Sequence, residues 1–318
     1  MKVLITGSSG LLGRMLIGHL LTTDAEIVGI DIRESPEFMN RERFRFYNCS
    51  ITDKEKLKSV FQEEQPTNVM HFACSFNKVR NKTREYEIDI DGSDNILEIC
   101  NDTPSVRQLI FSSSSAVYGG KKDNPLWMKE SDPLLPDNYR YGMNKKIVED
   151  RFTNISVRND LKVVILRLCL ITGPIFDKPK SVISILIKMP FLPRFTKEMK
   201  LQFIHCEDMS ALMELIMKDT DISGVYNLVP DSYALVGEIV PEKRFISLPF
   251  FLIKGFMWIC WHLKITNIQP ASVINSFYPT IVDSSKIISR YGYKFKYNSK
   301  EAFLDTKMNN RLPADVWF

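Results

Sequence analysis

The sequence predicts an α/β fold, in which helices cover both faces of a doubly wound parallel sheet and a smaller, discontinuous C-terminal lobe is attached. Two observations predict the sheet. Short apolar segments alternate with helix-like segments through the first two thirds of the 318-residue chain, which is the pattern of parallel strands joined by helical crossovers. A glycine-rich turn directly follows the first apolar segment, as expected where a strand runs into a helix.

The elements follow in chain order. We expect strands near residues 2–6, 26–30, 44–48, 68–72, 108–112 and 162–168, and helices near 10–21, 54–63, 84–101, 138–155 and 208–218. After residue 173 prolines at 179, 190 and 193 indicate irregular chain. A return to the first domain is expected near 201–230. The predicted domains are therefore 1–173 with 201–230, and 174–200 with 231–318.

The glycine-rich turn predicts a nucleotide-binding site. Gly7, Gly10 and Gly13 follow the first strand at the spacing G-x-x-G-x-x-G. Gly7 permits a tight turn, Gly10 permits backbone N–H groups to approach a pyrophosphate, and Gly13 permits the next helix to pack on the strand. The N-terminal dipole of that helix favours phosphate. The pattern predicts a Rossmann-type, dinucleotide-binding domain.

An acidic residue at the end of the second strand indicates which dinucleotide binds. Asp31 stands 18 residues after Gly13, where a carboxylate accepts hydrogen bonds from the adenosine ribose hydroxyls. The same charge repels a 2′-phosphate, so we expect NAD rather than NADP. Arg33, two residues on, keeps NADP open because it could pair with that phosphate. We interpret Arg33 as a solvated loop charge.

Two further segments predict proton chemistry beside the cofactor. Tyr141 and Lys145 stand four residues apart, on one face of the helix expected at 138–155. A neighbouring ammonium favours the phenolate form of a tyrosine. The serine run Ser112–Ser115 follows the apolar segment 108–111, and hydroxyls at the carboxyl end of a parallel strand face the ligand crevice of such sheets. The three segments together indicate a nicotinamide-dependent enzyme.

These motifs resemble those of the extended short-chain dehydrogenase/reductase family, in particular its NAD-dependent sugar epimerase/dehydratase branch. The resemblance covers most of the chain. Its motifs are T-G-S-S-G-L-L-G at 6–13, N-V-M-H-F-A at 68–73, the serine segment 112–119, Q-F-I-H-C-E-D at 202–208 and G-V-Y-N-L at 224–228.

The resemblance implies specific roles. It implies that Ser114, Tyr141 and Lys145 are catalytic and that the helices near 84–101 and 138–155 pair in a homodimer. It implies that Ser75, Ser115 and Ala116 lie on the substrate side. Besides Gly7, Gly10, Gly13, Asp31, Arg33, Tyr141 and Lys145, it implies cofactor contacts for Ser9, Leu11, Leu12, Ile32, Ser50, Ile51, Phe72, Ala73, Cys74, Ser112, Leu168 and Leu170.

Departures from the family pattern concern the substrate. Leu170 stands where members acting on nucleotide-sugars often carry Asn, and Leu201 with Gln202 stand where they often carry Arg. Ser50 replaces an Asp that usually contacts adenine, and Asp89 replaces a usual Asn. The resemblance therefore implies the hydride chemistry more firmly than it implies a nucleotide-sugar.

Three functions remain open. The leading hypothesis is an NAD-dependent epimerase/dehydratase-like enzyme acting at a hydroxyl-bearing carbon of a sugar-like or nucleotide-sugar substrate. Dehydration is disfavoured because Ser115 and Ala116 occupy the positions where related dehydratases carry Asp-Glu. The alternatives are an NAD(P)-dependent carbonyl reductase or alcohol dehydrogenase acting on a less polar substrate, and a non-catalytic NAD(P)-sensing protein.

Composition excludes several other classes of protein. The net charge is +4 without a long Lys/Arg run, so nucleic-acid binding is not expected. The six cysteines form no C-x-x-C pair and the four histidines show no metal-ligand spacing, so we expect reduced thiols and no metal site. The chain begins directly with a strand, and we expect a cytoplasmic protein.

One strongly apolar segment spans residues 246–263. Pro249, Lys254, Gly255 and His262 interrupt it, and it is short for a bilayer span. We expect a helix of the substrate lobe, and a contact with a membrane interface remains open.

Overall fold

The computed structural model describes residues 1–75, 81–136, 139–173, 182–194, 198–266, 269–272, 278 and 280–309. The chain forms two compact units. The first comprises Met1–Val117, Arg140–Arg167 and Ser210–Tyr226, and the second Tyr118–Tyr139, Leu168–Met209 and Asn227–Phe318. The predicted boundaries differ from these units at four segments. The prediction placed residues 118–139, 168–173, 201–209 and 227–230 in the nucleotide-binding domain, whereas they belong to the second unit. Residues 174–181, predicted to begin the smaller lobe, lie outside the described residues.

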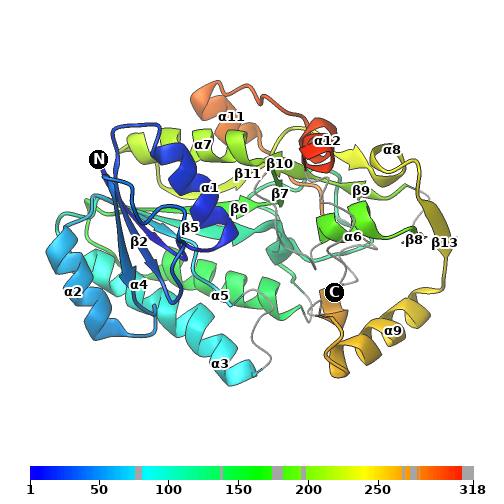
Figure 1. Ribbon diagram of the computed structural model, residues 1–318, viewed down its shortest axis with the longest axis horizontal. Helices are drawn as coiled ribbons and strands as arrows, with labels where there is room; N and C mark the ends of the chain where they lie inside the picture. Colours follow the sequence, from blue (N-terminus) through cyan, green and yellow to red (C-terminus); the bar gives the residue numbers. More distant parts are fainter. Residues whose placement is uncertain are drawn as a thin grey trace. The chain divides into compact units, whose positions relative to one another are not determined.

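A seven-stranded sheet forms the centre of the first unit (Figure 1). Its strand order is β11-β6-β5-β4-β1-β2-β3, and the pairs β3–β2, β2–β1, β1–β4 and β4–β5 are parallel. The direction of winding reverses between β1 and β4, which defines a switch point where ligands bind at the carboxyl ends of the strands. The strands are β1 Lys2–Thr6, β2 Glu26–Asp31, β3 Phe44–Asn48, β4 Asn68–His71, β5 Gln108–Ser114, β6 Lys162–Leu168 and β11 Gly224–Leu228.

Helices cover both faces of this sheet, as predicted. On one face lie α1 (Leu11–Leu20) and α7 (Cys206–Lys218), and on the other lie α2 (Lys54–Glu64), α4 (Gly92–Asp102) and α5 (Arg140–Asn154) (Figure 1). The second group contributes Leu57, Phe61, Ile96, Val148 and Phe152 to one apolar cluster with the strands. The doubly wound parallel fold is therefore confirmed.

The helix expected at 84–101 differs from the prediction, because it is not continuous. It consists of α3 (Lys82–Tyr86), one π-helical turn (Glu87–Asp91) and α4. A π-turn adds one residue to a helical turn and changes the direction in which side chains project. This turn places the buried Asp89 beside the segment that follows β4.

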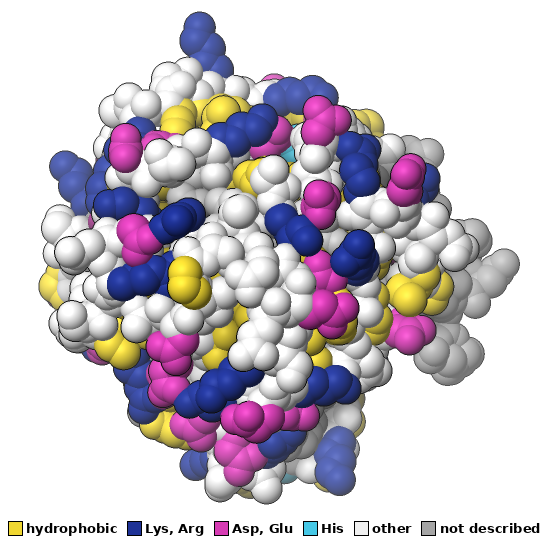
Figure 2. Space-filling model, turned by 90° about the vertical axis from the view of Figure 1, so that its left-hand side faces the viewer, with side chains coloured by type: hydrophobic (Ala, Val, Ile, Leu, Met, Phe, Trp, Pro, Cys, Tyr) yellow, Lys and Arg dark blue, Asp and Glu magenta, His cyan; other side chains and the backbone are white. Residues whose placement is uncertain are grey.

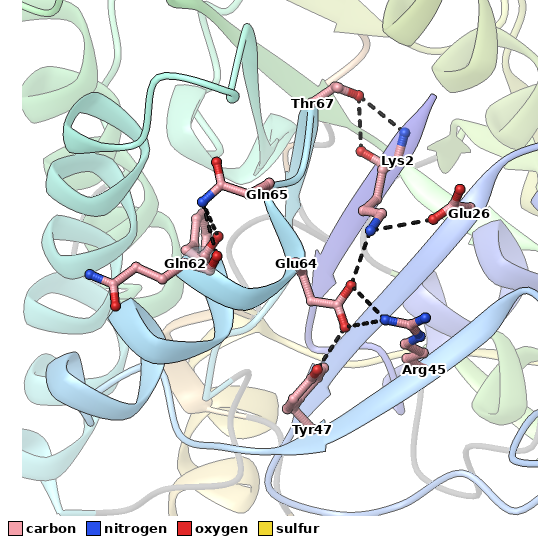
Figure 3. A network of polar contacts seen from close by, with 9 residues as sticks. Lys2, Glu26, Arg45, Tyr47, Gln62, Glu64, Gln65 and Thr67 are labelled. Carbon is pink, nitrogen blue, oxygen red and sulfur yellow. Dashed lines mark hydrogen bonds and ion pairs between the residues drawn. The ribbon is translucent and has the colours of Figure 1, made fainter.

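A polar network around Glu64 joins two strands and a helix of the first unit (Figure 3). The carboxylate of Glu64, at the end of α2, is 1% exposed. It accepts hydrogen bonds from Tyr47 Oη at 2.6 Å, Arg45 Nη1 at 3.2 Å and Lys2 Nζ at 3.3 Å. Burial opposes ionisation, but these three donors outweigh it and lower the pKa of Glu64. Glu64 thereby joins β1, β3 and α2.

The second unit contains three short two-stranded sheets. Parallel pairs join β7 (Leu170–Thr172) to β10 (Phe203–His205) and β8 (Phe191–Arg194) to β13 (Arg244–Ser247), and an antiparallel pair joins β9 (Lys200–Leu201) to β12 (Ala234–Leu235). Its helices are α6 Val182–Lys188, α8 Val236–Ile239, α9 Phe250–His262, α11 Ser285–Tyr291 and α12 Ser299–Asn309, with a 3-10 turn at Pro270–Ser272. Another 3-10 turn, Ser115–Tyr118, follows β5 and crosses the boundary of the first unit.

Charged side chains are mixed on the face drawn in Figure 2. Lys and Arg alternate there with Asp and Glu, and the hydrophobic side chains among the described residues are scattered. Within the described part of the chain, no helix has the length and apolar character needed to cross a bilayer.

Candidate active site at the carboxyl edge of the sheet

The turn between β1 and α1 has no room for side chains at its glycines. Gly7 adopts a φ of +71°, and a Cβ there would lie 2.8 Å from the backbone nitrogen of Ala73. A Cβ on Gly13 would lie 2.5 Å from the carbonyl oxygen of Gly7, and one on Gly10 would lie 3.0 Å from the same oxygen. The backbone is therefore close-packed here, and the N-terminus of α1 opens directly from the turn.

Asp31 lies against this turn. Its Oδ2 accepts a hydrogen bond from the backbone N–H of Ser9 at 3.1 Å, and its Oδ1 accepts one from the N–H of Arg33 at 3.2 Å. Ser9 Oγ in turn donates to the carbonyl oxygen of Arg33. The first turn of α1 carries no acidic residue, so the positive helix end is not neutralised by its own side chains. The second strand and the glycine turn thus present one polar surface.

The residues that follow β3 pack against α4. Ile51 is buried, and a Cβ on Gly92 would lie 2.7 Å from its side chain. The carbonyl oxygen of Ile51 accepts a hydrogen bond from Asn95 Nδ2 at 3.0 Å, and Ser50 Oγ lies 2.8 Å from Thr52 Oγ1. These contacts join the end of β3 to α4.

A directional hydrogen-bond chain crosses the switch point. Thr6 Oγ1 accepts the backbone N–H of Ala73 at 3.3 Å and lies 2.7 Å from His71 Nδ1. On the other side of the ring, His71 Nε2 lies 2.9 Å from Ser93 Oγ, which donates to the carbonyl oxygen of Asp89 at 2.6 Å. Because Ser93 uses its proton on Asp89, the proton of His71 resides on Nε2, and Nδ1 accepts from Thr6.

His71 is therefore a neutral linker rather than an acid or base. Its side chain is fully buried and stacks on Phe111 with a ring-centroid distance of 5.6 Å. Burial and the positive charge of Lys145 lower the pKa of His71 to about 3.

Asp89 connects the segment after β4 with the helix that carries the predicted catalytic pair. Its Oδ1 accepts the backbone N–H of Ser75 at 2.7 Å. Its Oδ2 accepts Ser75 Oγ at 3.0 Å and Asn144 Nδ2 at 2.9 Å. Asp89 is 6% exposed, so all three bonds form away from water. The carboxylate fixes Ser75 and α5 relative to each other.

Lys145 is buried at the end of β5. Its Nζ donates to the carbonyl oxygen of Ser112 at 2.6 Å and lies 4.5 Å from the ring centroid of Phe111. The ring centroid of Tyr141 is 5.8 Å from the same nitrogen. The structure thus brings the predicted pair together. The residue Lys145 is 5% exposed. A cavity of about the size of one water molecule adjoins Lys145. Its lining residues are Ala73, Cys74, Asp89, Ser93, Phe111, Asn144, Lys145 and Val148.

The next turn of α5 is fastened to the sheet by a buried ion pair. Glu149 accepts hydrogen bonds from Arg167 Nε and Nη2, the latter at 2.7 Å, and also from Ser113 Oγ. All three side chains are buried. Arg167 lies in β6 and Ser113 in β5, so the helix bearing Tyr141 and Lys145 is held against two strands.

Most of the predicted site residues belong to the first unit and follow the carboxyl ends of β1 to β5. Ser114 ends β5, where its Oγ accepts the N–H of Ala116 at 3.2 Å, and Ser115 begins a 3-10 turn. Ile32 and Arg33 are exposed beyond β2, whereas Phe72 is buried beyond β4. Leu168 and Leu170 belong to the second unit.

The residues that sequence reasoning missed are supporting ones. Thr6, Ser93 and Asn144 were not singled out, and Asp89 was noted only as a departure from a family pattern. Apart from the bond of Ser93 to the Asp89 carbonyl four residues earlier, their partners are 14 to 67 positions away in sequence. No local spacing indicates these longer contacts. A polar residue at the end of a buried strand, as Thr6 is, was the one available signal.

No metal site is found in the part of the chain that the structure describes. There, no group of three or more His, Cys, Asp or Glu side chains is arranged to hold an ion. None of the six cysteines, all of which lie within the described residues, forms a disulfide, and burial raises the pKa of Cys100, Cys169 and Cys206.

Comparisons with known proteins agree on one family. Residues 3–228 match the model of the NAD dependent epimerase/dehydratase family. An uncharacterized protein of Mycobacterium tuberculosis is 25% identical over 318 aligned residues, covering 95% of this chain and 82% of that protein. UDP-glucose 4-epimerase 2 of Oryza sativa is 32% identical over 181 residues, covering 52% of this chain and 43% of that protein.

A solved structure shows the same fold. The Bordetella bronchiseptica enzyme WbmG, in complex with NAD and UDP, superposes with a TM-score of 0.77 at 20% sequence identity. The superposition covers 96% of this chain and 93% of WbmG. Nearly all of the chain, including most of its second unit, therefore has a counterpart of known structure.

Proposed function

The chain belongs to the NAD dependent epimerase/dehydratase family, and we propose that it binds NAD at the carboxyl edge of its sheet and transfers hydride at a hydroxyl-bearing carbon. The observation that carries this proposal is the position of Lys145. Its ammonium is buried on the Ser112 carbonyl, one helical turn from Tyr141, at the same sheet edge as the glycine turn.

The residues present suit the cofactor. The β1–α1 turn has no space for a Cβ at Gly7 or Gly13, and the helix that follows offers uncompensated N–H groups to a pyrophosphate. Asp31 already accepts two N–H groups at the end of β2, and its carboxylate favours ribose hydroxyls over a 2′-phosphate. When bound, NAD supplies the hydride acceptor. Gly7, Gly10, Gly13 and Asp31 would hold its adenosine diphosphate part.

The proton chemistry falls to three side chains. Tyr141, as a phenolate, accepts the proton of the substrate hydroxyl. Lys145 stabilises the phenolate by its charge. One of the three N–H groups of Lys145 donates to the Ser112 carbonyl, which leaves two for other partners. Ser114 donates a hydrogen bond to the substrate oxygen. A base next to a fixed ammonium is active at a lower pH than a free phenol.

The substrate we favour is a nucleotide-sugar, on the strength of the family and of the names of its relatives. A rice relative is a UDP-glucose 4-epimerase, and WbmG was solved with UDP. With such a substrate, return of the hydride to the other face of a keto intermediate gives net epimerisation.

One observation favours a second candidate, a carbonyl reductase or alcohol dehydrogenase acting on a less polar substrate. Gln202 stands where the family often carries Arg, and its amide is occupied within the second unit. It donates to the carbonyl oxygens of Pro230 at 2.8 Å and Val282 at 3.0 Å, and it accepts the N–H of Val282 at 3.0 Å. Gln202 is 3% exposed. Because its amide is neutral, it offers no cation to a diphosphate.

The variant Tyr141→Phe tests the catalytic proposal. Turnover of a panel of nucleotide-sugars is measured by product analysis, and NAD binding is measured by titration calorimetry. We expect loss of turnover with NAD affinity within about twofold of wild type, because the ring remains and only the proton acceptor is removed. Turnover equal to that of wild type would exclude Tyr141 as the base.

The cofactor balance separates the two candidates. An epimerase regenerates NAD in every cycle and gives no net change in absorbance at the reduced nicotinamide band. A dehydrogenase or reductase changes that absorbance by one equivalent per product molecule. Native mass spectrometry of freshly purified protein would identify a retained cofactor, and finding NADP in place of NAD would contradict the role given to Asp31.

A further inference from the structure

The second unit exposes most of the apolar side chains of α9. Within this helix Phe251 is 70% exposed, Phe256 65% and Trp258 56%. Only Ile253 and Cys260 are buried. We define the α9 apolar surface as the exposed residues Phe251, Leu252, Phe256, Trp258, Ile259, Leu263 and Ile265.

These side chains lie in two stripes along the helix. Leu252, Phe256, Ile259 and Leu263 follow at spacings of four, three and four residues, so they line one stripe. Phe251 and Trp258, seven residues apart, form a second stripe about 100° around the helix from the first. Together they leave on the order of 800 Å² of mainly apolar surface exposed, whereas the largest patch of a typical monomer is about 300–600 Å².

The charges in the sequence on either side of α9 are of one sign. Between residues 243 and 282 the sequence contains no Asp or Glu. Lys254 and Lys264, one in the middle of the helix and one beyond its end, are both exposed, as is His262. The surface is thus apolar with a cationic border, which is complementary to an anionic one.

The geometry points to a lipid surface rather than a second copy of the chain. A two-fold interface would place the same cationic helix on both sides, with no carboxylate on α9 to pair with Lys254. A 13-residue helix is about 20 Å long and cannot span a hydrocarbon core of about 30 Å. α9 is apolar on most of its sides and carries exposed aromatic side chains with lysines at its border. Such a helix suits the membrane interface, where aromatic rings sit at the level of the headgroups and lysines reach the phosphates.

We propose that α9 anchors the protein reversibly to membranes containing anionic lipids, with the α9 apolar surface inserted among the headgroups and Lys254 and Lys264 near the phosphates. The proposal is independent of the catalytic one, because it uses no residue of the candidate active site. Membrane binding would then have two separable contributions, one apolar and one electrostatic.

The test is co-sedimentation of the full chain with vesicles. We expect binding to vesicles of phosphatidylcholine mixed with phosphatidylserine, weaker binding to phosphatidylcholine alone, and loss of that difference at high salt. The partition coefficient should fall by at least about tenfold in the double variant Phe256→Glu/Trp258→Glu. Each of Lys254→Ala and Lys264→Ala should lower it by roughly fivefold on the anionic vesicles only.

Met308→Glu is the control for an added carboxylate outside α9, because Met308 is 62% exposed on α12 of the same unit. It adds one negative charge where the double variant adds two. It should bind as wild type does. Circular dichroism of each variant shows that the fold is kept, since the substituted side chains are exposed. Equal binding of the double variant and wild type would overturn the proposal.

Two other occupants of the surface give different results. Sedimentation velocity without lipid would reveal a dimer that Phe256→Glu dissociates, and such a dimer without vesicle binding would overturn the proposal. Vesicle binding that appears only after removal of residues 310–318 would also overturn it, because the surface would then be covered by the chain's own C-terminal segment.

Discussion

Replacing Gly13 with alanine tests the close packing of α1 on the glycine turn. The added Cβ would lie 2.5 Å from the carbonyl oxygen of Gly7 and 2.6 Å from two backbone atoms of Ser8. Because carbon atoms in contact lie about 3.5–4.0 Å apart, the helix must move away by roughly 1 Å. All three neighbours are backbone atoms, so no side-chain rotation relieves the overlap.

The magnitude follows from two opposing effects. Overpacking of a close contact costs about 1–3 kcal/mol and more where backbone must move, whereas alanine in place of glycine favours a helix by about 1 kcal/mol. We expect a net loss of about 2 kcal/mol in the free energy of unfolding. NAD affinity should fall by at least about tenfold, since tenfold corresponds to only 1.4 kcal/mol and the displaced turn is the proposed phosphate site.

Gly18→Ala provides the control in the same helix. No atom lies within 4 Å of a Cβ at that position, so alanine should stabilise the protein by about 0.5–1 kcal/mol and leave NAD affinity unchanged. Urea unfolding followed by circular dichroism gives the stabilities, and titration calorimetry gives the affinities. If Gly13→Ala unfolds at the wild-type urea concentration and binds NAD with wild-type affinity, the helix does not depend on this close approach.

Two further predictions concern the buried carboxylates. Asp89→Ala leaves three donors from Ser75 and Asn144 without an acceptor. We therefore expect the free energy of unfolding, measured with urea, to fall by about 3–5 kcal/mol, against about 1–2 kcal/mol for Asp89→Asn. Equal losses in the two variants would contradict the role of the carboxylate as acceptor. For Glu64, the lowered pKa means that its ionised form stabilises the fold above about pH 4.5, and that this stabilisation is lost as pH falls below that value. Glu64→Gln should therefore lower the free energy of unfolding by about 2 kcal/mol at pH 7 and reduce its decline below pH 4.5, and an unchanged acid decline would show that other groups cause it.

The strands and the glycine turn were predictable because their signals are local. The expected strand at 2–6 is observed as β1 Lys2–Thr6, and the expected strand at 44–48 as β3 Phe44–Asn48. Parallel strands buried on both faces read as short apolar runs, and their order follows from the handedness of the crossovers. The helix expected at 54–63 ends one residue later, at Glu64.

The interruption of the helix at 84–101 was not predictable from periodicity. A π-turn changes the register of the helix by one residue, and nothing in the spacing of its apolar residues marks the place. The turn is stabilised by contacts with Ser75 and Asn144, which are 14 residues before and 55 residues after Asp89. Contacts across such separations depend on the tertiary fold. The predicted homodimer through this helix and α5, and the cytoplasmic location, stay predictions.

The roles of Ser114, Tyr141 and Lys145 also stay predictions, although the sequence placed two of them correctly on one helix. The spacing of four residues fixed a common face. It gave no information on burial, and the structure adds that Lys145 is held by the Ser112 carbonyl under the ring of Phe111. Helix spacing specifies which side chains can meet, whereas the sheet behind them decides how far each is desolvated.

The hydrogen-bond partners at position 89 explain why an aspartate suits that position. Its three partners are the N–H and hydroxyl of Ser75 and the amide nitrogen of Asn144, and all three donate. A carboxylate has acceptors on both oxygens, whereas an amide would turn one donor toward another. Asp89 also lines the same small cavity as Lys145. A single carboxylate thus satisfies three donors, one of them on α5, and aspartate in place of the usual Asn is consistent with the observed position of the helix that carries Tyr141 and Lys145.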